Sequence, residues 1–156
     1  MPRNTLVRQV MTTDVLAFKP EDKVQAAAEA MSKRSIGGSP VVDDDGKVVG
    51  MLNDDDLIVS DVRLHAPTVI SVLGAYLELP SSASRFDKEV RKAIGSTVGD
   101  VMTSNPQTCS EDDTLEQVAT VLHEHELSRL PVVRDGKLVG IVSRGDILKA
   151  IVQKGP

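Results

Sequence analysis

The chain contains the stretch PVVDDDGKVVG at residues 40–50 and repeats it as PVVRDGKLVG at residues 131–140. In each stretch an apolar run leads into Asp-Gly, and a second apolar run follows. Asp-Gly between two apolar runs is a strong signal for a β-hairpin, because glycine accepts the positive φ that a tight turn needs. The sequence therefore predicts the same hairpin twice in one chain.

The repetition extends well beyond these hairpins. Val10-Met11-Thr12 returns as Val101-Met102-Thr103, which is an offset of 91 residues (101 minus 10). The second hairpin turn is one residue shorter, so that Asp56 corresponds to Asp146 at an offset of 90 (146 minus 56). An internal repeat determines the architecture of a chain, because each copy must form the same local structure. We therefore expect two copies of one folding unit.

Each copy also contains a helix signal before its hairpin. An extended piece at 15–18 or 107–109 comes first, and apolar residues then recur at the i, i+3, i+4, i+7 spacing of one helix face. These residues are Val24, Ala27, Ala28 and Met31 in the first copy, and Leu115, Val118, Ala119 and Leu122 in the second. A second helix is expected after each hairpin, at 54–64 and 144–153. The repeated unit is therefore βαββα.

The starts of the two helices before the hairpins carry possible capping boxes. Asp22 has Gln25 three residues later, and Asp113 has Glu116. A carboxylate at the N-cap and a polar side chain three residues on can satisfy free N–H groups of the first turn. We therefore expect both helices to begin directly after these aspartates.

The predicted fold class is α+β, with two βαββα repeats. A unit of about 50 residues buries too little surface to be stable alone, so we expect the repeats to pack together with pseudo-twofold symmetry. The predicted domains are a first repeat at 7–64, a helical connecting segment at 65–95 and a second repeat at 96–154. The connecting segment either covers a flank of the repeats or forms a docking surface, and we favour the first reading.

Composition excludes several function classes. Aromatic residues make up 2% of the chain and the net charge is −5, which argues against stacking on single strands and against attraction to a phosphate backbone. Cys109 is the single cysteine, so no intrachain disulfide can form and a reducing compartment is expected. The most apolar stretch, at 68–79, is shorter than a membrane span and contains Glu78. We expect a cytoplasmic protein without membrane insertion.

The junction between the second strand of each hairpin and the following helix carries the candidate chemistry. It contains GIVSRGD at 140–146 and GMLNDDD at 50–56. A helix N-terminus offers unpaired N–H donors, and a carboxylate beside a hydroxyl can accept from the vicinal hydroxyls of a ribose. This chemistry suits a nucleotide, with Ser143 and Asp146 on the sugar and Arg144 near phosphate. The alternative is that Ser143 and Asp146 only cap the helix.

The whole pattern resembles a tandem pair of cystathionine-β-synthase (CBS) domains, also called a Bateman module. The resemblance rests on the repeat itself, the Val-Met-Thr start, the Pro-Val-Val strand and the Gly-hydrophobic-x-Ser-x-x-Asp junction. It implies βαββα units that bind AMP, ADP, ATP or S-adenosylmethionine in a cleft between the repeats. It also implies a non-catalytic energy-sensing or other regulatory role, a homodimer and a separate protein partner of unknown identity, with no required cofactor.

Carried onto this chain, the family motif gives one complete site and one altered site. In the second repeat Ser143 and Asp146 match, Gly145 leaves the approach open, and Arg144 and Arg129 are phosphate-facing candidates. Thr108, in the extended piece 107–109, is a further ligand-binding candidate. In the first repeat Asp56 matches, whereas Asn53 stands where Ser or Thr is usual.

The altered site is also more acidic. Asp54 and Asp55 add two carboxylates where a phosphate would approach, and like charges oppose binding. We therefore predict that the second repeat carries the main nucleotide site. The first repeat's site is expected to be empty, weaker, or filled by a less anionic adenosyl ligand or through a metal ion.

Other chemical readings are less favoured. His123 and His125 are two residues apart on a predicted helix, so they make a poor metal pair and are expected to be solvated. Asp43, Asp44 and Asp45 precede Gly46 in a hairpin, where aspartate is good turn chemistry. Cys109 is expected to pack as a small residue. The competing function class is a structural or protein-interaction module whose degenerate sites bind no nucleotide.

Overall fold

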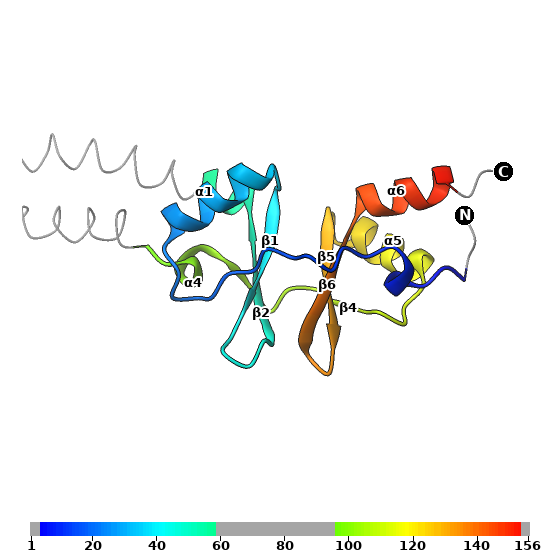
Figure 1. Ribbon diagram of the computed structural model, residues 1–156, viewed down its shortest axis with the longest axis horizontal. Coiled ribbons are helices and arrows are strands. Elements are labelled where there is room, and N and C mark those ends of the chain that lie inside the picture. Colours follow the sequence, from blue (N-terminus) through cyan, green and yellow to red (C-terminus); the bar gives the residue numbers. More distant parts are fainter. Residues whose placement is uncertain (1–3, 59–95, 154–156) are drawn as a thin grey trace, which may run out of the picture. The chain divides into compact units, whose positions relative to one another are not determined.

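The computed structural model describes residues 4–58 and 96–153 (Figure 1). Within these ranges the chain forms two three-stranded sheets, which confirms the α+β class. One sheet has the order β1 (Gly38–Val42), β2 (Val48–Asn53), β3 (Thr103–Ser104), and the other has the order β4 (Cys109–Ser110), β5 (Arg129–Arg134), β6 (Lys137–Ser143). The predicted connecting segment at 65–95 lies outside the described residues.

The described helices are η1 (Val7–Gln9), α1 (Val24–Arg34), α4 (Val98–Val101), α5 (Leu115–Glu124) and α6 (Arg144–Gln153). The helix predicted from the apolar spacing after residue 23 is α1, and the one after residue 114 is α5. The helix predicted at 144–153 is α6. Residues 54–58 are helical as predicted, and the remainder of that predicted helix, 59–64, lies outside the described residues.

Both predicted capping boxes are wrong, and the one that forms, at α5, lies one residue later than predicted. The N-cap of α5 is Thr114, whose Oγ1 accepts from the Gln117 N–H at 3.2 Å while the Thr114 N–H donates to Gln117 Oε1 at 2.8 Å. Asp113 instead accepts from the Ser110 N–H with Oδ2 at 2.8 Å. An aspartate just before a helix can close the preceding turn rather than the helix, because its short side chain reaches nearby backbone N–H groups on either side.

The first repeat shows the same shift without the compensating cap. Asp22 Oδ2 accepts from the Lys19 N–H at 2.8 Å, so this carboxylate also closes the turn before the helix. The N-cap of α1 is Lys23, which makes no side-chain capping hydrogen bond. The helix start in the first repeat therefore lacks the side-chain acceptor that its counterpart has.

Both predicted hairpins are confirmed. Between β5 and β6 the two loop residues Asp135 and Gly136 have φ of 53° and 79°, the positive values of a type I′ turn. The longer loop between β1 and β2 is closed by Asp43, whose Oδ1 accepts from the N–H groups of Asp45 and Lys47, each at 2.9 Å. The aspartate run before Gly46 thus supplies turn chemistry, which was the favoured reading.

The compact units of the structure differ from the sequence repeats. Of the described residues, 4–17, 42–49 and 105–153 form one unit, called unit 1 here, and 18–41, 50–58 and 96–104 form unit 2. The segment that begins the first repeat therefore lies with the second repeat's helices and sheet. The segment that begins the second repeat, 96–104, likewise lies with the first repeat's strands.

Matching hydrogen bonds hold the exchanged segment in each unit. In unit 1 the Val7 N–H donates to the Asp113 carbonyl at 2.8 Å, and the Leu115 N–H donates to the Thr5 carbonyl at 2.9 Å. In unit 2 the equivalent Val98 N–H donates to the Asp22 carbonyl at 2.8 Å. Figure 1 shows the η1 segment beside α5 in unit 1. The same exchange is therefore built twice.

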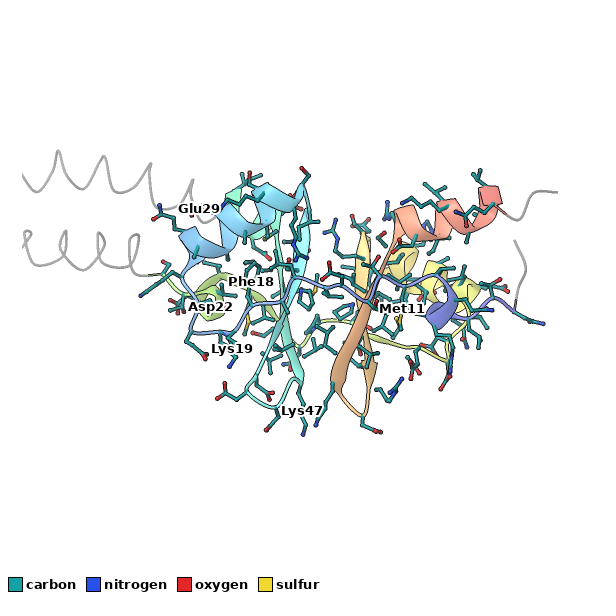
Figure 2. The ribbon with its side chains drawn as sticks, viewed as in Figure 1. Met11, Phe18, Lys19, Asp22, Glu29 and Lys47 are labelled. Atoms are coloured by element: carbon teal, nitrogen blue, oxygen red, sulfur yellow. The ribbon has the colours of Figure 1, made fainter. Side chains whose placement is uncertain are left out.

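The presence of a Met and a Gly at equivalent positions of both repeats follows from this exchange. In unit 1 Thr12 pairs antiparallel with Ile141 of β6 through two backbone hydrogen bonds of 2.9 Å. Met11, labelled in Figure 2, belongs to this segment. It lies against Gly140, where an added Cβ would be 2.8 Å from Met11 Sδ and 3.0 Å from the Thr12 carbonyl oxygen. Gly50 makes the same close approach to Met102 in unit 2. Glycine is needed at both positions because the exchanged segment occupies the space of its side chain.

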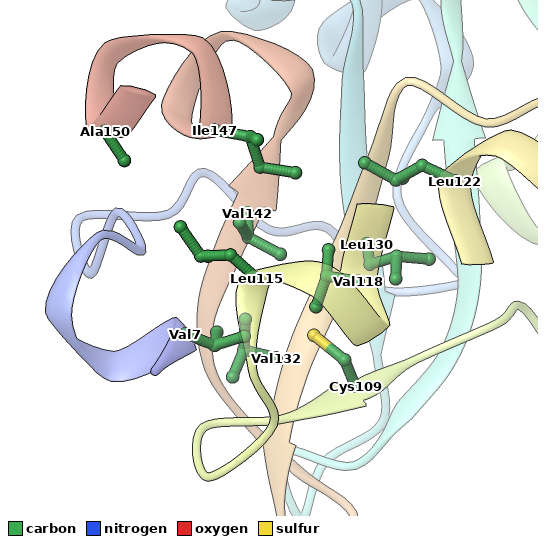
Figure 3. Packing of buried hydrophobic residues seen from close by; sticks show 10 residues of the cluster. All are labelled: Val7, Cys109, Leu115, Val118, Leu122, Leu130, Val132, Val142, Ile147 and Ala150. Carbon is green, nitrogen blue, oxygen red and sulfur yellow. The ribbon is translucent and has the colours of Figure 1, made fainter. Parts of the chain in front are cut away.

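The core of unit 1 lies between the β4-β5-β6 sheet and its two helices, and Val7 of the exchanged segment is part of it (Figure 3). The members come from η1, the three strands β4, β5 and β6, and the helices α5 and α6. They are Val7, Cys109, Leu115, Val118, Leu122, Leu130, Val132, Val142, Ile147 and Ala150. Because Val7 is 0% exposed, the core is complete only when the exchanged segment is in place.

An ion pair between a buried glutamate and an exposed arginine ties the turn before α5 to the sheet of unit 1. Glu111 is 8% exposed and accepts two hydrogen bonds from Arg134, at 2.5 Å from Nε and 2.8 Å from Nη2. Beside it, Arg8 of the exchanged segment forms an ion pair with Asp112. The hydrogen bonds from Arg134 lower the pKa of the Glu111 carboxyl, because they stabilise its charged form.

We expect Gly140→Ala to destabilise the protein by about 1–3 kcal/mol, the usual cost of forcing an extra methyl into a packed site. Chemical denaturation measures the change. Gly145→Ala is the matched control, because a Cβ there meets only Ser143 Oγ at 3.5 Å. In a Met11→Ala background the cost of Gly140→Ala should shrink. Equal stability of Gly140→Ala and the parent chain would contradict this account.

We expect the stabilising effect of Glu111 to depend on pH. Because its folded pKa is lowered, the contribution is fully present above the unfolded glutamate pKa of about 4.3 and is lost as the pH falls through the folded value. The difference in free energy of unfolding between the parent chain and Glu111→Gln should therefore be largest near neutral pH and shrink in acid. Denaturation at several pH values tests this, with the exposed Glu124→Gln as control. A difference that is constant with pH would refute it.

Candidate ligand-binding site

The junction between β6 and α6 holds Ser143 and Asp146 in contact. The Ser143 N–H and Oγ–H both donate to Asp146 Oδ2, at 2.9 and 3.0 Å, and the Asp146 N–H donates to Ser143 Oγ at 3.2 Å. These bonds cap the helix, as the alternative reading expected. They use only one carboxylate oxygen, and among the described residues Oδ1 of Asp146 has no hydrogen-bond partner. The pair is therefore fixed in position and keeps one acceptor for a ligand.

The first repeat builds the same junction with different side chains. The Asn53 N–H donates to Asp56 Oδ2 at 3.0 Å, as Ser143 does to Asp146. The backbone before the helix is also matched, because the Asp54 N–H donates to the Gly37 carbonyl at 2.9 Å and the Arg144 N–H donates to the Ser128 carbonyl at 3.0 Å. Asp54 and Asp55 are exposed at the first repeat's junction. The two junctions therefore share a backbone and differ in charge.

The sheet of unit 1 brings Arg129 next to Ser143. The two residues are direct cross-strand partners at the end of β5 and β6. Side chains alternate along a strand, and Leu130 and Val132 of β5 face the helices, so Arg129 faces the other side of the sheet. Ser143 follows Val142, another core residue, and so lies on the same side as Arg129. The arginine is thus placed beside the serine of the junction.

Thr108 fits the same face of the sheet. It directly precedes Cys109, which is 6% exposed and belongs to the core, whereas Thr108 itself is exposed. The alternation of side chains therefore places it opposite the helices, as it does Arg129. β4 runs parallel to β5, with Cys109 opposite Val132. Thr108 thus lies one strand away from Arg129 on a shared face.

Arg144 takes a different direction. Its Nε donates to the Leu127 carbonyl at 2.9 Å, and its side chain lines a groove of about 320 Å³ between α5 and α6. The other lining residues are Ala119, Leu122, His123, Ile147 and Leu148. The structure therefore brings together Arg129, Ser143 and Asp146, and places the Arg144 side chain on the helix side of the sheet. Gly145 is exposed in the first turn of α6, where it adds no bulk beside Ser143.

The sequence reading used Val-Met-Thr only as a marker of the repeat. It missed that residues 10–12 form the edge of the sheet that carries Ser143, through the pairing of Thr12 with Ile141. It also missed the Leu127 carbonyl that holds Arg144. The recurrence of Val-Met-Thr was a visible signal that residues 10–12 have a structural role. The Leu127 carbonyl gave no such signal, because a backbone acceptor after a helix leaves no mark in the side-chain pattern.

The side candidates have ordinary structural positions. His123 and His125 are both exposed near the end of α5, and the described part of the chain contains no group of three metal-ligating side chains. Cys109 is buried and its Sγ–H donates to the Pro131 carbonyl at 3.8 Å. Burial, and to a smaller degree Asp113, raises the pKa of the Cys109 thiol to about 12. In residues 4–58 and 96–153 we find no helix of the length and apolarity that crossing a membrane requires.

Comparison with known proteins decides the family. The CBS domain model matches the chain twice, at residues 7–62 and 98–153. The chain belongs to the CBS domain family. Its two matches make it a CBS pair, the arrangement of a regulatory module, and the fold expected from the resemblance is confirmed.

Two relatives show how much of a protein this CBS pair represents. CBSX1, a chloroplastic CBS domain-containing protein of Arabidopsis thaliana, is 37% identical over 144 residues. That match covers 90% of this chain and 60% of CBSX1, so the chain spans only part of that relative. The uncharacterized protein MJ1426 of Methanocaldococcus jannaschii is 28% identical over 154 residues, and the match covers 94% of this chain and 91% of MJ1426.

Solved structures of CBS pairs agree with the architecture. The crystal structure of CBSX2 in complex with AMP is 31% identical, with a TM-score of 0.75 over 96% of this chain and 98% of that one. The CBS domain of a membrane protein from Sphaerobacter thermophilus is 29% identical, with a TM-score of 0.68 over 96% of this chain and 89% of that one. The CBS pair described here therefore has a liganded structural neighbour above 30% identity.

We expect the Cys109 thiol to be unreactive in the folded protein, because its pKa of about 12 leaves almost no thiolate near pH 8 and its side chain is buried. Alkylation with iodoacetamide, followed by mass spectrometry, should label it only after denaturation. A Thr108→Cys, Cys109→Ser variant moves the thiol to the exposed neighbouring position and should be labelled at once. Rapid labelling of native Cys109 would contradict the buried position.

Proposed function

We propose that this CBS pair binds an adenosyl ligand at the β6–α6 junction of the second repeat. The observation that carries the proposal is the Ser143–Asp146 pair, which is held by three hydrogen bonds and keeps Oδ1 of Asp146 as an acceptor. A ribose supplies two adjacent hydroxyl donors for such a carboxylate. The AMP complex of CBSX2, at 31% identity, supports an adenosyl ligand, and AMP, ADP, ATP and S-adenosylmethionine remain the candidates.

The side chains around each junction favour the second repeat as the main site. Arg129 stands beside Ser143, whereas the first repeat has Gly38 at the equivalent position, 91 residues earlier (129 minus 91). At the first repeat's junction Asp54 and Asp55 are exposed and would repel a phosphate. We therefore propose that the Asn53–Asp56 junction is empty, weaker, or used by a less anionic adenosyl ligand or through a metal ion.

Arg129 and Arg144 have separable roles in this proposal. Arg129 faces the same side of the sheet as Ser143 and is the nearer candidate for phosphate. Arg144 is fixed by the Leu127 carbonyl, so a phosphate contact from it must come from its Nη atoms. Gly145 contributes by leaving the approach to Ser143 and Asp146 uncrowded. Thr108 contributes by lining the same face of the sheet as Arg129.

The proposed consequence of binding is regulatory rather than catalytic. A ligand that binds one arrangement of the module better than another shifts the population toward it, and a separate protein partner reads the change. We also propose a homodimer, for which α6 offers the exposed apolar residues Leu148, Ile151 and Val152. The single buried cysteine fits a reducing compartment, the cytoplasm being our expectation.

Calorimetric titration and thermal shift with AMP, ATP, S-adenosylmethionine and NAD test the proposal. A ligand at a hundredfold excess over its dissociation constant should stabilise the fold by about 2.7 kcal/mol. Asp146→Ala should abolish this binding, whereas the matched Asp56→Ala variant should retain it. The unliganded melting point of each variant must be measured first, because both carboxylates also accept from a backbone N–H at the start of a helix.

Two outcomes would favour an alternative to this proposal. Loss of binding only in Asp56→Ala would move the main site to the first repeat. No shift with any ligand would favour the interaction module with degenerate sites.

The ratio of AMP affinity to adenosine affinity tests the phosphate contacts of the two arginines. Arg129→Ala should lower this ratio, and Arg144→Ala should lower it less.

A further inference from the structure

We infer that unit 2, which carries Asn53 and Asp56, opens locally at a lower free energy than unit 1. The two units share a backbone plan, and equivalent positions can therefore be compared directly. Three independent differences between them all weaken unit 2. The inference concerns local stability and does not rest on the proposed ligand.

The first difference lies in the cores. Ser39 of β1 is 0% exposed, and its Oγ has no hydrogen-bond partner among the described residues. The equivalent position in unit 1, 91 residues later, is Leu130, which is 0% exposed and belongs to the core cluster. A buried hydroxyl without a partner loses its hydration and gains nothing in return, whereas a leucine gains from burial. Unit 2 is therefore weaker at this position.

The second difference lies at the helix starts. Thr114 and Gln117 form a reciprocal capping box at α5, while the equivalent residues at α1 are Lys23 and Ala26. Neither of these side chains can accept a hydrogen bond from the first turn. The side-chain cap that stabilises α5 is therefore missing from α1, which frays more readily.

The third difference lies in two ion pairs of unit 1, one of which involves its exchanged segment. In unit 1 Glu111 binds Arg134 twice, and Arg8 of the exchanged segment pairs with Asp112. The positions in the first repeat that correspond to Glu111 and Arg134 hold Pro20 and Asp43, and Gly99 corresponds to Arg8. An uncharged proline and a glycine cannot form these pairs. Unit 2 therefore has no counterpart of either ion pair.

Local opening follows the weakest contacts of a structure, since hydrogen exchange reports free energies that range from near zero up to the global value. A missing side-chain cap, a buried unpaired hydroxyl and the lack of counterparts to the Glu111–Arg134 and Arg8–Asp112 pairs each lower the free energy of opening unit 2. Unit 1, with its Ser143–Asp146 junction, stays folded while unit 2 opens and closes. The two units of the fold therefore differ in their resistance to local opening.

Native-state hydrogen exchange on the full chain tests the inference at a matched pair of amides. The Ala27 N–H donates to the Lys23 carbonyl at 3.0 Å, and the Val118 N–H donates to the Thr114 carbonyl at 3.1 Å. Both residues are 1% exposed and lie 91 positions apart, so their settings match. We expect the Ala27 protection factor to be lower by a factor of about 5–30, the range for a small difference in stability. Equal protection, or better protection of Ala27, would overturn the inference.

Substitutions that transfer features between the units give a second test. Ser39→Ala removes the unpaired hydroxyl, and Lys23→Thr with Ala26→Gln builds the missing capping box, so both should raise the protection of Ala27 and narrow the difference. The reverse change, Thr114→Lys, should lower the protection of Val118. Ser104→Ala, at an exposed position of β3 in the same unit, is the control and should leave the ratio unchanged. An unchanged ratio in all the transfer variants would refute the proposed cause.

Discussion

The packing of a methionine against a glycine Cα, made once in each unit, is the contact on which the rest of this structure depends. Met11 occupies the space beside Gly140, and Met102 occupies the space beside Gly50. Each methionine belongs to a segment that pairs with a sheet strand of the other repeat. In each contact the methionine and the glycine come from different repeats: β3 of the second repeat completes the β1-β2-β3 sheet, and Thr12 of the first repeat bridges to β6.

This exchange also places the candidate site. The strand that ends at Ser143 is β6, and its free edge is covered by the segment around Thr12. Pairing at the edge holds β6, and β6 in turn places Ser143 opposite Arg129 and before the first turn of α6. The carboxylate of Asp146 then closes back onto Ser143. The hydrogen-bond ladder and the helix cap together fix the site without a loop of its own.

The two halves use one backbone plan with unequal side chains. Matched hydrogen bonds, such as Val7 to Asp113 and Val98 to Asp22, show that the plan is the same. The side chains then separate the halves in charge at the junctions and in stability within the units. Repetition of the backbone thus leaves room for two different roles, because a strand and a helix tolerate many side chains at exposed and cap positions.

The sequence by itself determined the repeats, the hairpins at Gly46 and Gly136, the helix faces and the Ser143–Asp146 junction, because each depends on residues a few positions apart. It placed the capping box of α5 one residue too early, since several polar residues near Thr114 compete for the same N–H groups, and it predicted a box at α1 that does not form. Only the tertiary structure decided which sheet each Val-Met-Thr segment joins, and that Arg129 lies beside Ser143 while Arg144 turns to Leu127. Those outcomes depend on contacts between residues far apart in the chain, and periodicity within one segment carries no information about them.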